Sequence, residues 1–230
     1  MPRAIGLVVT AATDEVDIAA TTYNEQTSGA QRSVKSADAG DAAAGTGIRT
    51  LRIVYYALSA GVITGPFVEV LTMNGTTAVP TVATNIALIE KMEAVTVGSG
   101  GGAAGAITLY ANAAGGSTAI AQIGQSFNRT FLAHHYVPSN RRCHITDVQA
   151  FGGNATAALT SLKRKAIPSA NQADLVVSGP YITSATVPAV APLPDAPYSP
   201  IPGPCRLHMQ VTPGNNTSQM TLASFGFYED

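Results

Sequence analysis

Two adjacent histidines, His134 and His135, are the residues of this chain whose types best suit chemistry, and Cys143, His144 and Asp147 follow soon after them. Imidazole, thiolate and carboxylate groups could bind a metal ion. Structural metal sites, however, show paired ligands at short fixed spacings, which this segment lacks. Neighbouring side chains on a strand also point to opposite faces. We therefore expect ordinary strand histidines, one facing inward and one at a subunit contact, with a metal site as the alternative.

A glycine-rich run, Gly98 to Ala103, matches the pattern of a dinucleotide-binding loop that follows a strand. Such a loop needs a helix after it, whose N-terminus meets the phosphates, and an acidic residue about twenty positions later. The next segment, residues 106–110, alternates like a strand, and the first acid after Glu93 is Asp147. The run therefore predicts a flexible hairpin loop and not a nucleotide site.

The serine, cysteine and carboxylate residues show no arrangement that is typical of an enzyme. The sequence has no GxSxG nucleophile elbow, and nothing in it pairs Cys143 or Cys205 with a base. Glu90 and Glu93 have the spacing of one helix face, which more often indicates a solvated surface than a pair of glycosidase acids. The chain has no Trp, which disfavours a sugar-stacking cleft. We predict no enzyme and no catalytic, cofactor-binding or metal-binding residue.

The composition limits the class of protein. Apolar residues make up 46% of the 230 residues and charged residues only 12%, about half of the roughly 25% that is usual in soluble domains. Such a surface is rich in uncharged polar side chains, or other subunits cover part of it. The net charge of −1 argues against a nucleic-acid partner. No run approaches the roughly 20 apolar residues that span a bilayer, so we expect no membrane partner.

The two cysteines and the N-terminus bear on the compartment. Two cysteines are too few for a disulfide scaffold, so two reduced core thiols are favoured over a Cys143–Cys205 bridge. The first twelve residues lack the apolar stretch and the cleavage site of a signal peptide. We expect a soluble protein that is not secreted by the usual route.

Charge is unevenly distributed along the chain. Acids predominate up to residue 41, and bases predominate between residues 129 and 165. Opposite signs in two segments suit head-to-tail contacts between subunits, and solvated loop ends are the alternative. The residues concerned are Asp14, Glu15, Asp17, Glu25, Asp38 and Asp41 in the first segment, and Arg129, Arg141, Arg142, Lys163, Arg164 and Lys165 in the second.

Residues 1–45 are expected to form an N-terminal arm. Residues 5–10 could be a short strand, but residues 24–47 have almost no large apolar side chains. Such a stretch buries too little surface to offset its ordering entropy, so it is mobile or held by another chain. Deleting residues 1–35 should then leave the rest folded and weaken attachment to a larger assembly.

From residue 46 onward the pattern predicts one all-β domain, 46–230. Residues 49–56 and 67–73 alternate with β-favouring side chains, and Asn74-Gly75 is typical of a tight hairpin turn. Residues 82–93 carry apolar side chains at helical spacing and predict one short helix. Further strands are expected over 94–97, 106–110, 117–123, 127–133, 142–148, 157–162, 206–211 and 220–228.

Residues 166–204 contain nine prolines and are expected to be an extended connector on the surface of the domain, since proline cannot donate to a central strand ladder. Many short strands separated by turn signals indicate a sandwich or jelly roll. The predicted fold class is therefore all-β: a jelly-roll-like β-sandwich with one short helix and an extended N-terminal arm.

Several of these segments resemble, in the same order, a family of tailed-bacteriophage virion proteins. The resemblance covers about residues 36–165 and the last thirty or so. It is carried by the runs SADAGDAAAGTGIRT (36–50), MNGTTAV (73–79), TNIALIEKMEAVTVGSGG (84–101) and NRTFLAHHYVP (128–138), and by the final strand pair.

The resemblance implies a jelly-roll-like sandwich that oligomerises on the virion and has no catalytic residues. Such proteins serve as head-decoration (cement) proteins, or as neck, collar and tail accessories such as fibre bases. The low charge and the arm favour a decoration homotrimer that contacts the major capsid protein and is assembled in the cytoplasm of the host bacterium. A neck or tail protein, and a receptor- or sugar-binding module using Tyr55, Tyr56, Tyr136, Tyr181 and Tyr198, are the alternatives.

Overall fold

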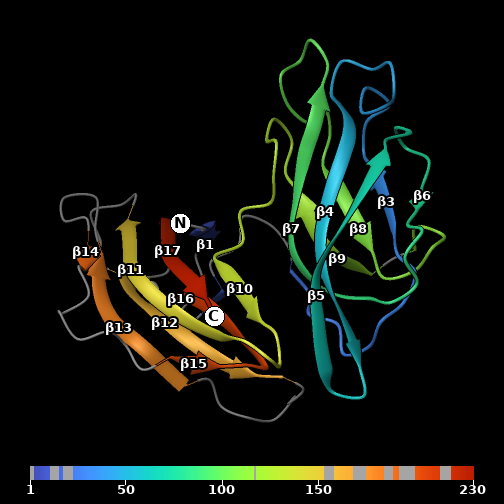
Figure 1. The fold of residues 1–230 in the computed structure, drawn as a ribbon. Helices are drawn as coiled ribbons and strands as arrows, with labels where there is room; N and C mark the ends of the chain where they lie inside the picture. The colour runs from blue at the N-terminus through green and yellow to red at the C-terminus, as the bar shows by residue number, and fades with distance from the viewer. Residues whose placement is uncertain are drawn as a thin grey trace. The chain divides into compact units, whose positions relative to one another are not determined.

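The chain is all-β, as predicted. The computed structural model describes residues 3–10, 16–17, 23–116, 118–152, 158–167, 175–183, 189–191, 200–212 and 219–230. Its regular elements in these ranges are strands, and the pairings between them are antiparallel (Figure 1).

The chain divides into two compact units, which differ from the predicted arm and single domain. Unit 1 combines residues 1–20 with residues 131–230, and unit 2 is the continuous segment 21–130. Each unit consists of two antiparallel sheets whose side chains share one core, which is the arrangement of a β-sandwich.

Unit 1 has sheets of the order β1-β17-β11-β14, with β15 also on β11, and β10-β16-β12-β13, with β2 also on β16. The first sheet comprises β1 (Arg3–Thr10), β17 (Gln219–Glu229), β11 (Arg142–Gly152), β14 (Ala189–Ala191) and β15 (Ile201–Pro202). The second comprises β10 (His134–Val137), β16 (Cys205–Thr212), β12 (Ala158–Ala166), β13 (Leu175–Thr183) and β2 (Val16–Asp17).

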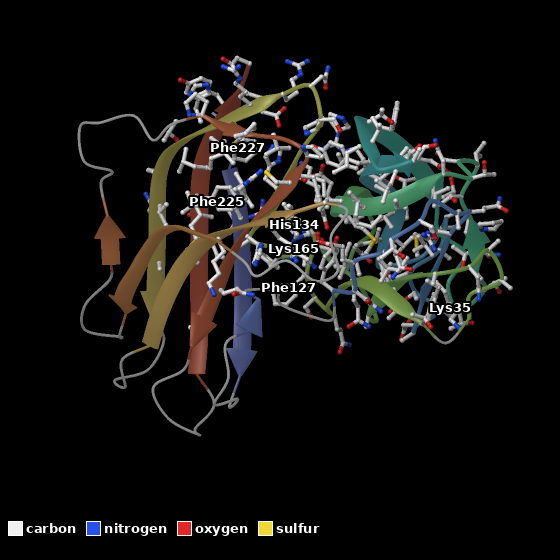
Figure 2. All side chains as sticks on the ribbon, turned by 90° about the horizontal axis from the view of Figure 1, so that it is seen from below. Lys35, Phe127, His134, Lys165, Phe225 and Phe227 are labelled. Carbon is white, nitrogen blue, oxygen red and sulfur yellow. The ribbon has the colours of Figure 1, made fainter. Side chains whose placement is uncertain are left out.

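The core of unit 1 lies between these sheets. Phe225 and Phe227 extend into it from β17 (Figure 2), and Leu207 and Met209 enter from β16. Successive inward residues are two positions apart, as strand geometry requires. Cys143 and Cys205 are free thiols buried in the same core.

Unit 2 has a four-stranded sheet of the order β6-β3-β8-β9 and a three-stranded sheet of the order β5-β4-β7. Ile53 from one sheet and Leu109 from the other are fully buried in the shared core. The strands are β6 (Val79–Pro80), β3 (Ser33–Ser36), β8 (Ile107–Tyr110) and β9 (Ala119–Ile123), then β5 (Val62–Thr72), β4 (Ile48–Ser59) and β7 (Ile86–Val97).

The predicted arm is divided between the two sandwiches: residues 1–20 belong to unit 1 and residues 21–45 to unit 2. All eight residues of β1 pair with β17, and β3 pairs with β8 and β6 inside unit 2. These pairings argue against the prediction that residues 1–35 could be removed without loss of folding, because the deletion would take strands from both units.

Buried polar side chains replace the missing apolar ones in residues 24–47. The Asp41 carboxylate is fully buried and accepts hydrogen bonds from the backbone N–H groups of Ile48, Ala104 and Gly105 and from the Ser36 hydroxyl. Arg32 donates to the carbonyls of Ser28, Ile86 and Ala111. Burial lowers the pKa of this guanidinium. These two side chains order a segment that hydrophobicity alone would leave unattached.

The predicted helix over residues 82–93 is wrong. Residues 86–97 form β7, which pairs along β4 with several register shifts. The four consecutive residues 86–89 are all buried, and the β7 residues in the core of unit 2 are Ile86, Ile89 and Met92, which are three positions apart. The register shifts between Tyr56 and Ala57 and between Val54 and Tyr55 each insert one residue of β7. They explain the spacing of three, which resembles the spacing of a helix in the sequence.

The predicted hairpin at Asn74-Gly75 is also wrong, although the chain does turn there. Gly75 has a φ of +59°, but β5 before the turn and β6 after it belong to different sheets. The hairpin of this region joins β4 to β5 through Ala60 and Gly61, whose φ values are +48° and +80°. This pair of positive φ angles is what a two-residue hairpin turn requires.

The predicted proline-rich connector contains strands in its described parts. β13 and β14 lie at the ends of the two sheet orders of unit 1, and β15 pairs with the start of β11. Pro180 lies in β13 where the register with β12 shifts, between the pairs Thr160–Tyr181 and Leu162–Ser178. An edge strand can accept a proline because its outer N–H groups need no ladder partner.

Candidate assembly surface

The two adjacent histidines lie on β10 and point to opposite faces, as strand geometry predicts. The His135 ring stacks on Phe227 with 3.8 Å between ring centroids, and its Nε2 lies 2.8 Å from Glu229 Oε1. His134 Nδ1 lies 3.3 Å from an Arg206 guanidinium nitrogen. Both histidines are at least 95% buried, with exposed fractions of 2% and 5%. Their partners lie on β16 and β17, which the sequence could not indicate.

The residues that follow are also separate from one another. His144 stacks on Tyr228 at 4.4 Å, and its Nε2 lies 3.3 Å from Asp230 Oδ2, whereas Cys143 is in the core. Within the described ranges, no three His, Cys, Asp or Glu side chains form a group that could hold a metal ion. Burial raises the pKa of the Cys205 thiol, and a protonated thiol is a poor nucleophile.

The glycine-rich loop is packed against the Asp41 segment. Glycine is required at Gly98, because a Cβ there would lie 2.3 Å from the Gly45 carbonyl oxygen. The N–H groups of Ala104 and Gly105 donate to Asp41, so these donors already have an anionic partner within the protein. The loop is a structural element of unit 2.

Glu93 belongs to a charged group on β7 and β4. Its carboxylate lies 2.7 Å from Arg52 and 3.0 Å from Lys91. Burial opposes ionisation of Glu93, but the hydrogen bonds and charges of Lys91 and Arg52 outweigh it and hold its pKa below the ordinary value. Glu90 and Glu93 are therefore strand residues and not the solvated face of a helix.

The most unusual surface feature is the second half of β5, residues 67–72. β5 is the terminal strand of its sheet, and in the described part of the chain no strand pairs with its outer edge. Phe67, Val68 and Val70 are 42%, 59% and 54% exposed. A long edge strand with exposed apolar side chains is a template for pairing with another chain.

Apolar side chains lie on both faces of this edge. The Phe67 ring lies 5.7 Å from the Tyr55 ring on the core side, while Val68 pairs with Val54 and Val70 pairs with Arg52 on the outer side. We call Phe67, Val68, Val70 and the neighbouring Val82 the β5 patch.

Val82 is the most exposed member of the β5 patch, at 85%. The Glu69 carboxylate holds it in place by accepting hydrogen bonds from the N–H groups of Val82, at 2.6 Å, and Ala83, at 3.1 Å. Burial, and then the Glu69 charge, raise the pKa of the Tyr55 hydroxyl. The Glu69 hydrogen bonds fix Val82 beside β5, and pairing with β4 fixes the other members of the β5 patch.

The tyrosines proposed as an exposed aromatic patch do not form one. Tyr55, Tyr56 and Tyr136 are buried. The Tyr181 side chain and the whole of Tyr198 lie outside the described residues. The sequence showed residues 67–73 as a strand, but it could not show that this strand lies at an edge, because edge position depends on pairings between distant segments.

Comparison of the chain with protein-family models, with curated proteins and with solved structures finds no match. Among the described residues, no helix is long and apolar enough to cross a membrane. The function must therefore be argued from the surface itself.

Proposed function

We propose that this protein is a non-enzymatic structural protein of a bacteriophage virion, a decoration (cement) protein that binds the head shell as a homotrimer. The observation that supports assembly most directly is the β5 patch, because it combines unpaired strand edge with exposed apolar side chains. The resemblance of residues 36–50, 73–79, 84–101 and 128–138 to virion proteins supports the particle as its location. The resemblance also implies a jelly-roll order of the strands, which we include in the proposal.

The occupant of the β5 patch is a neighbouring copy of the chain. Fully burying a Val or Phe side chain contributes about 1.5–3 kcal/mol, so four partly exposed ones contribute a few kcal/mol. Association costs about 4–15 kcal/mol. The patch therefore needs strand pairing and further contact area, up to the about 1,200–2,000 Å² of a stable interface. Three copies related by a threefold axis repeat the contact and close the ring.

Native mass measurement tests the assembly part of the proposal. We expect the wild-type protein to be a trimer and the Val68→Lys variant to be a monomer, because a charge in an apolar contact is desolvated without a partner. Val97→Lys is the matched control, since Val97 is also an exposed strand valine of the same sheet. A monomeric wild-type protein, or a trimer that survives Val68→Lys, would contradict the proposal.

Electron cryomicroscopy of the particle tests the location. A decoration protein occupies many sites on the shell, whereas a neck, collar or tail protein is present in few copies. Density for two-sandwich subunits on the head is the expected result. Density restricted to the neck or tail would replace the decoration role with the accessory role, and absence from the particle would refute both.

A further inference from the structure

Unit 2 contains a hollow on the face of its four-stranded sheet that points away from the core. Its volume is about 420 Å³, and Lys35 from β3, Thr108 and Tyr110 from β8, and Gln122 from β9 line it, together with Thr76. Figure 2 labels Lys35, which marks the hollow. The volume lies in the lower part of the roughly 300–1,000 Å³ range of small-molecule sites.

Strand register brings the polar side chains of the hollow into one row. Lys35 pairs with Thr108, and Thr108 pairs with Gln122, so the three side chains cross adjacent strands on the same face. Gln122 Nε2 donates to Thr108 Oγ1 at 2.9 Å, which orients the amide. The row stands on a rigid sheet, and groups on sheets are held more precisely than groups on loops.

Lys35 gives the hollow its charge. Its ammonium lies 5.1 Å from the centroid of the Tyr110 ring, close enough for a cation–π attraction that restricts where the charge lies. Among the described residues that line the hollow, Lys35 is the only one charged at neutral pH, and no carboxylate is present. The hollow therefore complements a ligand with one negative charge.

We propose that this hollow binds a sugar acid, a pyranose that carries one carboxylate, such as a hexuronic acid. The carboxylate pairs with the Lys35 ammonium. The ring hydroxyls exchange hydrogen bonds with Thr76, Thr108 and Gln122, and the Tyr110 ring borders the apolar face of the pyranose. A single charge with many hydroxyl groups fits this lining better than an apolar ligand, because each polar lining group then has a partner.

The site is separate from the β5 patch, since it lies on the other sheet of unit 2, so it does not depend on the assembly role. With one ion pair and a few neutral hydrogen bonds in an open hollow, we expect a Kd on the order of 1 mM for a single sugar.

A titration followed by amide NMR shifts tests the proposal, with glucuronic acid, glucose, acetate and inorganic phosphate as separate probes. We expect saturable shifts with glucuronic acid on β3, β8 and β9, and binding at least tenfold weaker for glucose and for acetate. Absence of saturation up to about 10 mM, or shifts elsewhere, would overturn the site. Binding of acetate or phosphate as tight as that of glucuronic acid would also overturn it, because it would show that the anion is attracted to Lys35 alone.

Variants separate the side chains from the fold. Lys35→Gln should weaken glucuronic acid at least tenfold, and Gln122→Glu should do the same by placing a carboxylate beside the ligand. Lys91→Gln is the control, because it removes a lysine from the other sheet, where it contacts Glu93. Binding that is unchanged in both Lys35→Gln and Gln122→Glu would refute the proposal. A folded Lys35→Arg variant that retains binding would support it.

Discussion

The two sandwiches differ in how their edge strands are protected. In unit 1, β14 has three residues, and β13 carries Pro180 at a register shift. In unit 2, β5 has eleven residues and presents Phe67, Val68 and Val70 to the outside. Short, proline-bearing and irregular edges are the usual devices against unwanted pairing. β13 and β14 have these devices, whereas β5 has them only around Pro66 and its register shift. Residues 67–72 lack them, which is why we propose unit 2 as the part that contacts neighbouring copies.

The two units also differ in the segments of the chain that form them and in the side chains that stabilise them. Unit 1 is assembled from both ends of the chain, since β1 pairs with β17 along its whole length, and aromatic rings pack against one another within it. Unit 2 is continuous in sequence, and its loops depend on the buried Asp41 and Arg32. Each of the following changes should therefore act mainly on one unit, and the other serves as its control.

Removal of residues 1–20 should have the largest effect. It deletes β1 and β2 and leaves the N–H and C=O groups of one side of β17 without their strand partner. We expect unit 1 to lose about 5 kcal/mol or more, a large part of the stability of a domain. Hydrogen exchange measured by mass spectrometry should show unprotected unit 1 peptides and protected unit 2 peptides. Equal protection of unit 1 with and without these residues would show that residues 1–20 are indeed a dispensable arm.

Phe225→Ala should destabilise unit 1 by about 3–5 kcal/mol, because it leaves a cavity at a fully buried ring. Phe225→Leu is the control that keeps most of the volume, and it should cost less than about half as much. Urea unfolding followed by near-ultraviolet dichroism measures the difference. Equal effects of the two variants would mean that the ring is not tightly packed.

Asp41→Asn should destabilise unit 2 by about 2–3 kcal/mol. Each carboxylate oxygen accepts two of the four hydrogen bonds, so the amide nitrogen would face two donors. A buried donor without an acceptor costs about 1–3 kcal/mol. Hydrogen exchange should increase for residues 36–48 and 98–105. Asp38→Asn is the matched control, since Asp38 is exposed and accepts from the Gly40 N–H. A change confined to unit 1 peptides would contradict the assignment.

Glu93→Gln should have the smallest effect, about 0.5 kcal/mol at neutral pH, since its partners Arg52 and Lys91 are nearly half exposed and solvent screens them. The folded pKa of Glu93 is depressed, so its contribution is present above the ordinary value of 4.5 and is lost as pH falls through the folded pKa. Urea midpoints of wild type and variant should therefore converge on acidification. A difference that grows below pH 4.5 would have the wrong sign.

Side-chain alternation was sufficient to predict much of the strand content. β4 and β17 follow from it directly, because one face of each is apolar over many residues. β7 did not, because the register shifts opposite β4 place its core residues Ile86, Ile89 and Met92 three positions apart. That departure depends on pairing with a distant strand and leaves no local signal other than a helical spacing.

The arm and the β5 patch show a second limit of sequence reasoning. Residues 24–47 have few large apolar side chains, and their order depends on contacts with distant residues. These contacts are the pairing of β3 with β8, the hydrogen bonds of Arg32, and those of Asp41 with amide groups more than sixty positions later. Likewise, nothing in the identity of Val68 and Val70 distinguishes them from valines of the core. They are exposed because they lie on the face of β5 that points away from the core. The unpaired backbone edge beside them follows from the position of β5 in the sheet, which local sequence does not encode.

The proposed contact between copies is tested most directly by the concentration dependence of hydrogen exchange in residues 67–72. If a neighbouring copy pairs with β5, the alternate amides that point away from β4 are protected in concentrated protein and exchange faster on dilution below the dissociation constant. Amides of β17 should show no such dependence. Exchange of residues 67–72 that is fast and independent of concentration would contradict assembly through β5.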